Sequence, residues 1–144
     1  MNPVTLGVHV AASRAEVFNY LANIENLPRW AGAFCERLEL ARGRWMGLTL
    51  HGDVFVELET DEHTGVIDLR WGEQDFLERV LPLRVIALPV GGTFVSGVLY
   101  PDVAQTQFAF EHECAAFASA LQALGGRLRT RECAGWNAAL CAAG

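Results

Sequence analysis

Lysine is absent from this 144-residue chain, so all eleven basic residues are arginines. Without a lysine amine, the protein can form no Schiff base on its own side chains and can carry no Walker-type phosphate loop. Positive charge is also scarce, since the formal net charge is −6 and only 19% of the residues are charged. This acidic balance argues against a nucleic acid or an anionic membrane as the main partner.

Cysteine motifs and long apolar segments are missing too. The four cysteines are widely spaced and form no Cys-x-x-Cys pair: Cys35, Cys114, Cys133 and Cys141. This spacing predicts neither a disulfide scaffold nor a bound metal, and nothing else in the sequence indicates a cofactor. No segment approaches the roughly 18 apolar residues that span a bilayer, and Met1–Val10 lacks the features of a secretory signal. We therefore expect reduced thiols and a cytoplasmic location.

The chain is rich in apolar side chains, with 51% hydrophobic residues, and its length suits one globular domain. Its first structured segment is Val4–Val10, a β-branched, alternating run that predicts a strand. Ser13 stands three residues before Glu16, the spacing of a capping box, and apolar residues follow at helical spacing over 14–22. Pro28 then starts a second, shorter helical turn.

Residues 34–100 differ in character, because short alternating runs are separated there by turn residues at about ten-residue intervals. Six strands are predicted, over 35–41, 44–51, 53–60, 65–72, 77–88 and 93–100. Gly91-Gly92 before the last of them suits a tight hairpin. The side chains expected on the buried faces of the two central strands are Val54, Val56, Leu58, Ile67, Leu69 and Trp71.

The last predicted element is a helix over 103–124, a segment without glycine or proline that is rich in alanine, glutamine, phenylalanine and leucine. Its expected buried stripe consists of Phe110, Cys114, Phe117, Leu121 and Leu124. Gly125-Gly126 is predicted to end the helix. The chain is accordingly divided into a folded domain over 1–125 and a loosely held tail over 126–144.

This order of elements predicts an α+β fold. A curved, seven-stranded antiparallel sheet wraps around one long C-terminal helix, with two short helices after the first strand. One face of the sheet must be covered, and the last helix is the only long one available. A twisted sheet around a single helix leaves a space on its concave side, and apolar spaces of this kind bind apolar ligands. We therefore expect a cavity between the sheet and this helix.

Residues 8–30 resemble the N-terminal signature of the SRPBCC (START-like, helix-grip) superfamily, and its polyketide cyclase/dehydrase-like branch in particular. The signature is a strand, then Ser-x-x-x-Val-Phe-x-x-Leu at 13–21, then Asn-x-x-x-x-Pro-x-Trp at 23–30. Gly-Gly-Thr at 91–93, followed by a strand and a C-terminal helix, matches a second recurring feature. The resemblance covers residues 1–125 and implies a deep pocket between the sheet and the long helix. Members include lipid carriers, hormone receptors and cyclases, so it implies no particular reaction.

Residues that could carry chemistry in such a pocket are few. No Gly-x-Ser-x-Gly or zinc-helix motif is present. His51 ends a predicted strand and His112 lies within the long helix, so either could act as a general base, while the hydroxyl of Tyr100 could orient a ligand. For each histidine a surface or structural role is the alternative. Arg84 and Arg70 could hold a ligand carboxylate, with exposed charge as the alternative.

The residues expected to contact a ligand are Trp30, Trp45, His51, Val56, Leu58, Leu69, Trp71, Tyr100, Phe108 and His112. The resemblance places Trp30 at the entrance of the pocket. The favoured function is binding or transport of a small hydrophobic or aromatic molecule. One alternative is an enzyme of the polyketide cyclase/dehydratase type that uses His51, His112 or Tyr100 as an acid or base in the same cavity. The other is a protein-interaction module whose tail docks on a partner or on a second copy, forming a homodimer.

Overall fold

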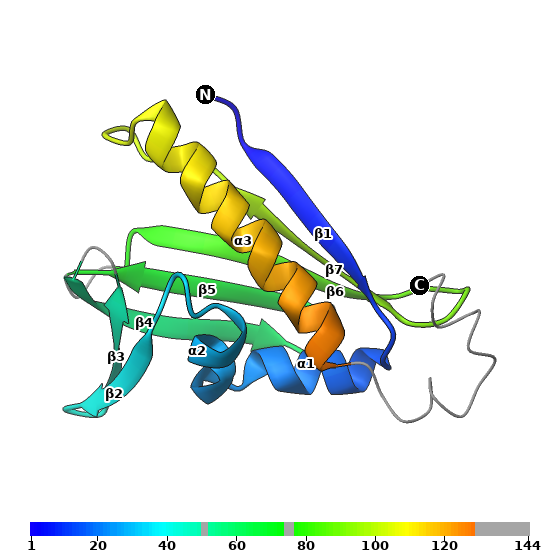
Figure 1. The fold of residues 1–144 in the computed structure, drawn as a ribbon. Coiled ribbons are helices and arrows are strands. Elements are labelled where there is room, and N and C mark those ends of the chain that lie inside the picture. Colours follow the sequence, from blue (N-terminus) through cyan, green and yellow to red (C-terminus); the bar gives the residue numbers. More distant parts are fainter. Residues whose placement is uncertain (50–51, 74–76, 129–144) are drawn as a thin grey trace.

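The computed structural model describes residues 1–49, 52–73 and 77–128, and Figure 1 shows how their helices and strands are arranged. The elements follow one another in the predicted order. They are β1 (Val4–Val10), α1 (Arg14–Ala22), the 3-10 turn η1 (Ile24–Asn26), α2 (Leu27–Trp30), β2 (Arg37–Ala41), β3 (Arg44–Thr49), β4 (Gly52–Asp61), β5 (Val66–Gly72), β6 (Arg79–Ala87), β7 (Thr93–Leu99) and α3 (Gln107–Arg127).

The seven strands form one antiparallel sheet in the order β1-β7-β6-β5-β4-β3-β2, which confirms the predicted fold class. Strands β2 to β7 make a meander, and β1 returns to pair with β7, where Val8 lies opposite Val95. The β2–β3 connection is a two-residue hairpin in which Arg42 and Gly43 both have positive φ, as a primed turn requires. The open edges of the sheet are therefore β1 and β2.

The central strands bury the face that their alternation predicts. Val54 and Val56 of β4 are buried, as are Ile67 and Leu69 of β5, while the alternating residues, among them Phe55 and Asp68, face the other side. We call the side that carries these four residues the inner face, since it is the side on which α3 packs. The opposite, convex side is the outer face.

Helix α3 begins later and ends later than the sequence predicts. It begins after Thr106, whose hydroxyl accepts a hydrogen bond from the Ala109 amide, so residues 103–106 are not helical. The predicted stop at Gly125-Gly126 is wrong, because the helix continues to Arg127. At Gly125 the helix lies close to β1: an added Cβ would stand 3.6 Å from the His9 carbonyl oxygen. Packing of the last turn against the strand thus outweighs the low helix propensity of glycine.

The buried stripe of α3 anchors it on the sheet. Phe110, Phe117, Leu121 and Leu124 are buried as predicted, and Cys114 is half-buried beside them. The end of the Phe117 ring lies over Gly97 of β7, where a Cβ would come within 2.8 Å of the ring. The absence of a side chain at position 97 therefore lets α3 approach the sheet closely.

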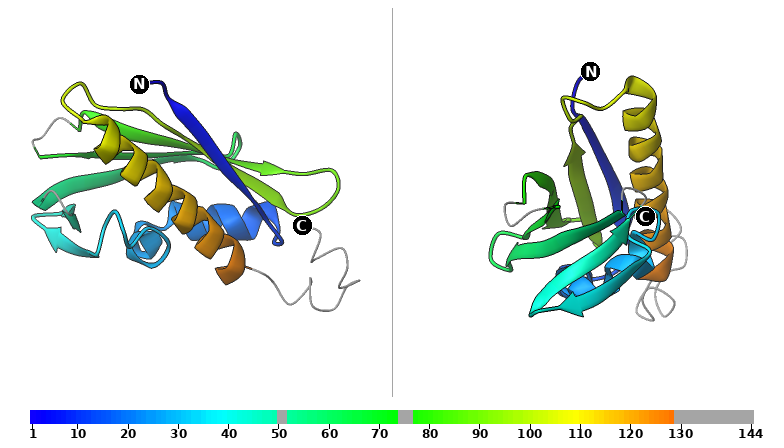
Figure 2. Two further views of the ribbon diagram at one scale, coloured as in Figure 1. Left: turned by 45° about the horizontal axis from the view of Figure 1, so that its top comes forward. Right: turned by 90° about the vertical axis from the view of Figure 1, so that its left-hand side faces the viewer.

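Helix α3 crosses the sheet diagonally and makes its most extensive contact with β1 (Figures 1 and 2). Helix α1 packs against β6, and α2 packs against α3, so the two short helices close one end of the inner face. The buried hydroxyl of Thr93 donates to the Ala12 carbonyl and joins β7 to the start of this region. Of the helices that the structure describes, none is long and apolar enough to cross a membrane.

Candidate functional site

The inner face carries an aromatic row that runs across four strands. Trp45 of β3 lies opposite Val56 of β4, Val56 lies opposite Trp71 of β5, and Trp71 lies opposite Arg79 of β6. Because directly opposed residues share a face, these four side chains stand side by side on the inner face. A second row, Leu58–Leu69–Leu81, runs next to it.

Burial along these rows is uneven. Val56 and Leu69 are buried, whereas Trp45, Leu58 and Trp71 remain partly exposed. The Trp71 ring meets Phe34 edge to face, with ring centroids 5.0 Å apart. Of the predicted ligand contacts, the structure thus brings together Trp45, Val56, Leu58, Leu69 and Trp71. They form an apolar surface that α3, seated over β1, leaves incompletely covered.

Arg79 ends the aromatic row and was not singled out from the sequence. Its guanidinium carbon lies 5.5 Å from the centre of the Trp71 ring and 5.6 Å from that of Tyr100, within the range of cation–π attraction. Only 18% of its side chain is exposed. Tyr100, a predicted ligand contact, therefore lies at the same corner of the inner face as Trp71.

Two carboxylates pair with Arg79. Its Nη2 lies 3.6 Å from Oε1 of Glu113 on α3, and its Nη1 lies 4.0 Å from Oδ2 of Asp102 in the segment before that helix. The other Glu113 oxygen accepts a 2.6 Å hydrogen bond from the Gln105 side chain, whose own oxygen accepts from the Asp102 amide. We call Arg79, Glu113, Asp102 and Gln105 the Arg79 cluster. It joins the first half of α3 to β6.

The two arginines predicted to hold a ligand carboxylate lie elsewhere. Arg84 is exposed, and Arg70 lies on the outer face with its Nε 3.2 Å from a Glu59 carboxylate oxygen. Alternation along β6 is the signal that identifies Arg79: it occupies the same face as Leu81, Leu83 and Val85, all of which are buried. A charged residue that alternates along a strand in step with three buried apolar residues indicates a charge on the buried face of the sheet.

The remaining predicted site residues lie apart from this surface. Trp30, expected at the entrance, is only 5% exposed and lies in the core, because α2 packs against α3. Phe108 is 80% exposed, and His112 is exposed on α3. His51 lies outside the described residues. His112 and Tyr100 do not share a buried environment, so the cyclase/dehydratase interpretation stays a prediction.

The two cysteines within the described ranges are poor nucleophiles. Burial raises the pKa of the Cys35 thiol, which donates to the Arg37 carbonyl, and outweighs backbone hydrogen bonds that act in the opposite direction. Burial also raises the pKa of Cys114, and the negative charges of Glu113 and Glu111 add to this effect. Both thiols therefore stay protonated at neutral pH, whereas the thiolate is the nucleophilic form.

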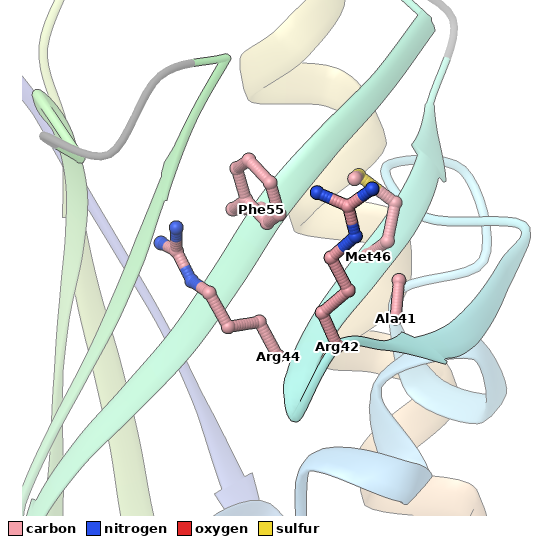
Figure 3. Close-up of a pocket in the computed structure, with 5 residues that line it drawn as sticks. All are labelled: Ala41, Arg42, Arg44, Met46 and Phe55. Atoms are coloured by element: carbon pink, nitrogen blue, oxygen red, sulfur yellow. The ribbon is translucent and has the colours of Figure 1, made fainter.

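A separate hollow of about 350 Å³ lies on the outer face at the β2–β3 hairpin, lined by Ala41, Arg42, Arg44, Met46 and Phe55 (Figure 3). Phe55 precedes Val56 in β4 and so points to the opposite side of the sheet. The Arg44 guanidinium stacks 4.0 Å from the centre of the Phe55 ring and lies 3.6 Å from a Glu57 carboxylate oxygen. This hollow is open and shares no residue with the inner face.

Neither a comparison with protein-family models nor one with curated proteins finds a match to this chain. Solved structures do resemble it. A START superfamily protein from Mycobacterium smegmatis has a TM-score of 0.63 at 15% identity, covering 88% of this chain and 96% of its own. The protein XoxI from Bacillus cereus has a TM-score of 0.71 at 15% identity, and the match covers 92% of this chain and 99% of XoxI. The Aha1 dimer from Colwellia psychrerythraea has a TM-score of 0.67 at 12% identity, and the match covers 90% of this chain and 97% of the Aha1 chain. The chain therefore has the helix-grip, START-like fold.

Proposed function

We propose that this helix-grip domain binds a small hydrophobic or aromatic molecule between the inner face of its sheet and helix α3. The observation that carries the proposal is the partial exposure of Trp45, Leu58 and Trp71 on the face that otherwise forms the core. Water in contact with these side chains is unfavourable, at about 25 cal/mol for each Å² of apolar surface. A ligand that covers them gains that free energy.

The distribution of contacts supports the same placement. Helix α3 packs most extensively on β1, at one edge of the sheet, whereas the aromatic row begins on β3 near the other edge and ends at Arg79 of β6. The ligand would therefore lie beside α3, with Trp71 at the centre of the surface and the Arg79 cluster at one end. A pocket lined by apolar side chains with a few polar groups at one end is the usual form of a small-molecule site.

Replacing Trp71 tests the proposal. We expect Trp71→Ala to weaken binding of the neutral apolar probe N-phenyl-1-naphthylamine by about tenfold or more, since tenfold corresponds to about 1.4 kcal/mol and an aromatic side chain buries about 150–250 Å². The measurement is a fluorescence titration of the full chain at fixed ionic strength, with thermal unfolding to confirm that the variant is folded.

Phe55→Ala is the matched control, because Phe55 is a partly exposed aromatic residue on the outer face of the neighbouring strand. Its replacement should leave probe binding unchanged. If Phe55→Ala weakened binding and Trp71→Ala did not, the probe would occupy the outer hollow and the proposed site would be wrong.

Assembly into a homodimer through the tail stays a prediction, because residues 129–144 lie outside the described ranges. The Aha1 neighbour was solved as a dimer. Under the tail hypothesis, the full chain has twice the mass of its 15.8 kDa monomer in solution, and a chain ending at Leu128 has the monomer mass. Light scattering on both chains measures this, and identical assembly of the two would rule out the tail as the interface.

A further inference from the structure

We propose that the Arg79 cluster selects ligands whose polar end is uncharged, and discriminates against carboxylic acids. The inference rests on the proposed function, because it concerns the polar end of a molecule bound on the aromatic row. It concerns only the charge of that polar end and makes no statement about the apolar part of the ligand.

The position of Arg79 determines what a ligand meets first. Arg79 follows Trp71 in the cross-strand row, and its guanidinium lies within 5.6 Å of the ring centres of both Trp71 and Tyr100. A molecule with its apolar part stacked on Trp71 can place its polar end at this cluster, because Arg79 is the neighbour of Trp71 on the next strand. Polar groups at that end must find partners there, since an unsatisfied buried polar group is costly.

The positive charge of Arg79 is already matched. Nη1 and Nη2 face different carboxylates, and both oxygens of Glu113 have a partner, one from Arg79 and one from Gln105. With one cation and two carboxylates, the cluster has an excess of one negative charge. A ligand carboxylate would therefore face two carboxylates while the one cation beside them, Arg79, is already paired with both. Like charges at such short range repel one another.

An uncharged polar group meets no such repulsion. An amide or hydroxyl can donate to a carboxylate oxygen of Asp102, which is half-exposed, or of Glu113, and it can accept from an Arg79 N–H. The same charges that repel an acid thus provide hydrogen bonds to its neutral counterpart. Discrimination of this kind comes from an unfavourable pairing built against the competitor.

The experiment compares two ligands that differ in charge and hardly in shape, 2-naphthamide and 2-naphthoate. Calorimetric titration of the full chain at pH 7 and physiological ionic strength should show the amide binding at least about tenfold more tightly, which is about 1.4 kcal/mol. The pair decanamide and decanoate repeats the comparison for an aliphatic ligand.

Substitutions then test whether the preference for the amide over the acid comes from the Arg79 cluster. Glu113→Gln removes the excess negative charge and keeps the shape of the side chain, so the ratio of the two affinities should fall to about threefold or less. Asp102→Asn, in a segment outside the helix, should shift the ratio in the same direction and guards against a folding defect in the first variant. Glu111→Gln removes the same formal charge from an exposed position of α3 and should leave the ratio unchanged.

The outcomes separate the inference from the proposed function. Equal or tighter binding of both acids overturns the inference and leaves the proposed function standing. An equal drop in the ratio for Glu113→Gln and Glu111→Gln also overturns it, because the preference would then come from the net charge of the protein. If neither the acids nor the amides bind, the proposed function fails as well.

Discussion

Replacing Phe117 with alanine should destabilise the protein by about 3–5 kcal/mol, the usual cost of removing a phenylalanine from a well-packed core. The side chain is 7% exposed, and the end of its ring lies over Gly97 of β7. No side chain at position 97 can move in to fill the space, so the cavity left by the substitution can close only if α3 or a neighbouring side chain such as Leu83 shifts. Urea unfolding followed by circular dichroism measures the loss.

Phe108→Ala is the matched control for this prediction. It removes the same ring from the same helix, but Phe108 is 80% exposed and contributes little to the core. The free energy of unfolding should change by no more than about 0.5 kcal/mol, as is usual for surface substitutions. Comparable losses in the two variants would mean that α3 is not held on the sheet through the face described above.

A second large effect is expected at Gly65, in the turn between β4 and β5. Its φ is +73°, and a Cβ there would lie 2.2 Å from the Val85 carbonyl oxygen, a backbone atom that cannot swing away. The Gly65 carbonyl also accepts from the Val85 amide, so the turn and β6 are held together at this point. Gly65→Ala should therefore cost more than the roughly 1–2 kcal/mol of a left-handed alanine, and we expect a loss of about 3 kcal/mol or more.

Gly43→Ala separates the conformational cost from the steric one. Gly43 has almost the same φ, +78°, but nothing lies within 4 Å of the position that its Cβ would take. Only the left-handed penalty of about 1–2 kcal/mol should appear there. Denaturation midpoints of the two variants, measured side by side, give the difference. Equal losses would contradict the close approach of Val85 to Gly65.

Local pattern predicts much of this fold because each signal lies within a few residues. Alternation predicts the inner face of β4 and β5, where Val54, Val56, Ile67 and Leu69 are buried. The capping box predicts the start of α1, where the Ser13 hydroxyl accepts from the Glu16 amide. Such features depend on neighbours one turn or one pleat away, so the chain needs no tertiary contact to specify them.

The end of α3 shows where local pattern fails. Two consecutive glycines predict a stop, yet the helix continues through them because its last turns pack on β1, a strand that lies more than 100 residues earlier in the sequence. Propensity is a small term per residue, and burial of Leu121 and Leu124 outweighs it. The burial of Trp30, which was expected at the entrance of the pocket, has the same cause, since it depends on a helix that comes much later in the chain.

The amino-acid sequence alone determined the set of helices and strands and the buried face of each central strand. It also determined the α+β architecture, which follows when one long helix must cover one sheet. The meeting of Trp71 with the Arg79 cluster required the folded molecule. Trp71 comes from β5, Arg79 from β6 and Glu113 from α3, and Asp102 lies in the connection between β7 and α3. Their meeting depends on strand register and on where α3 crosses the sheet. Periodicity carries no information about such distant pairs, since it reports which side a residue faces and not which partner it finds there.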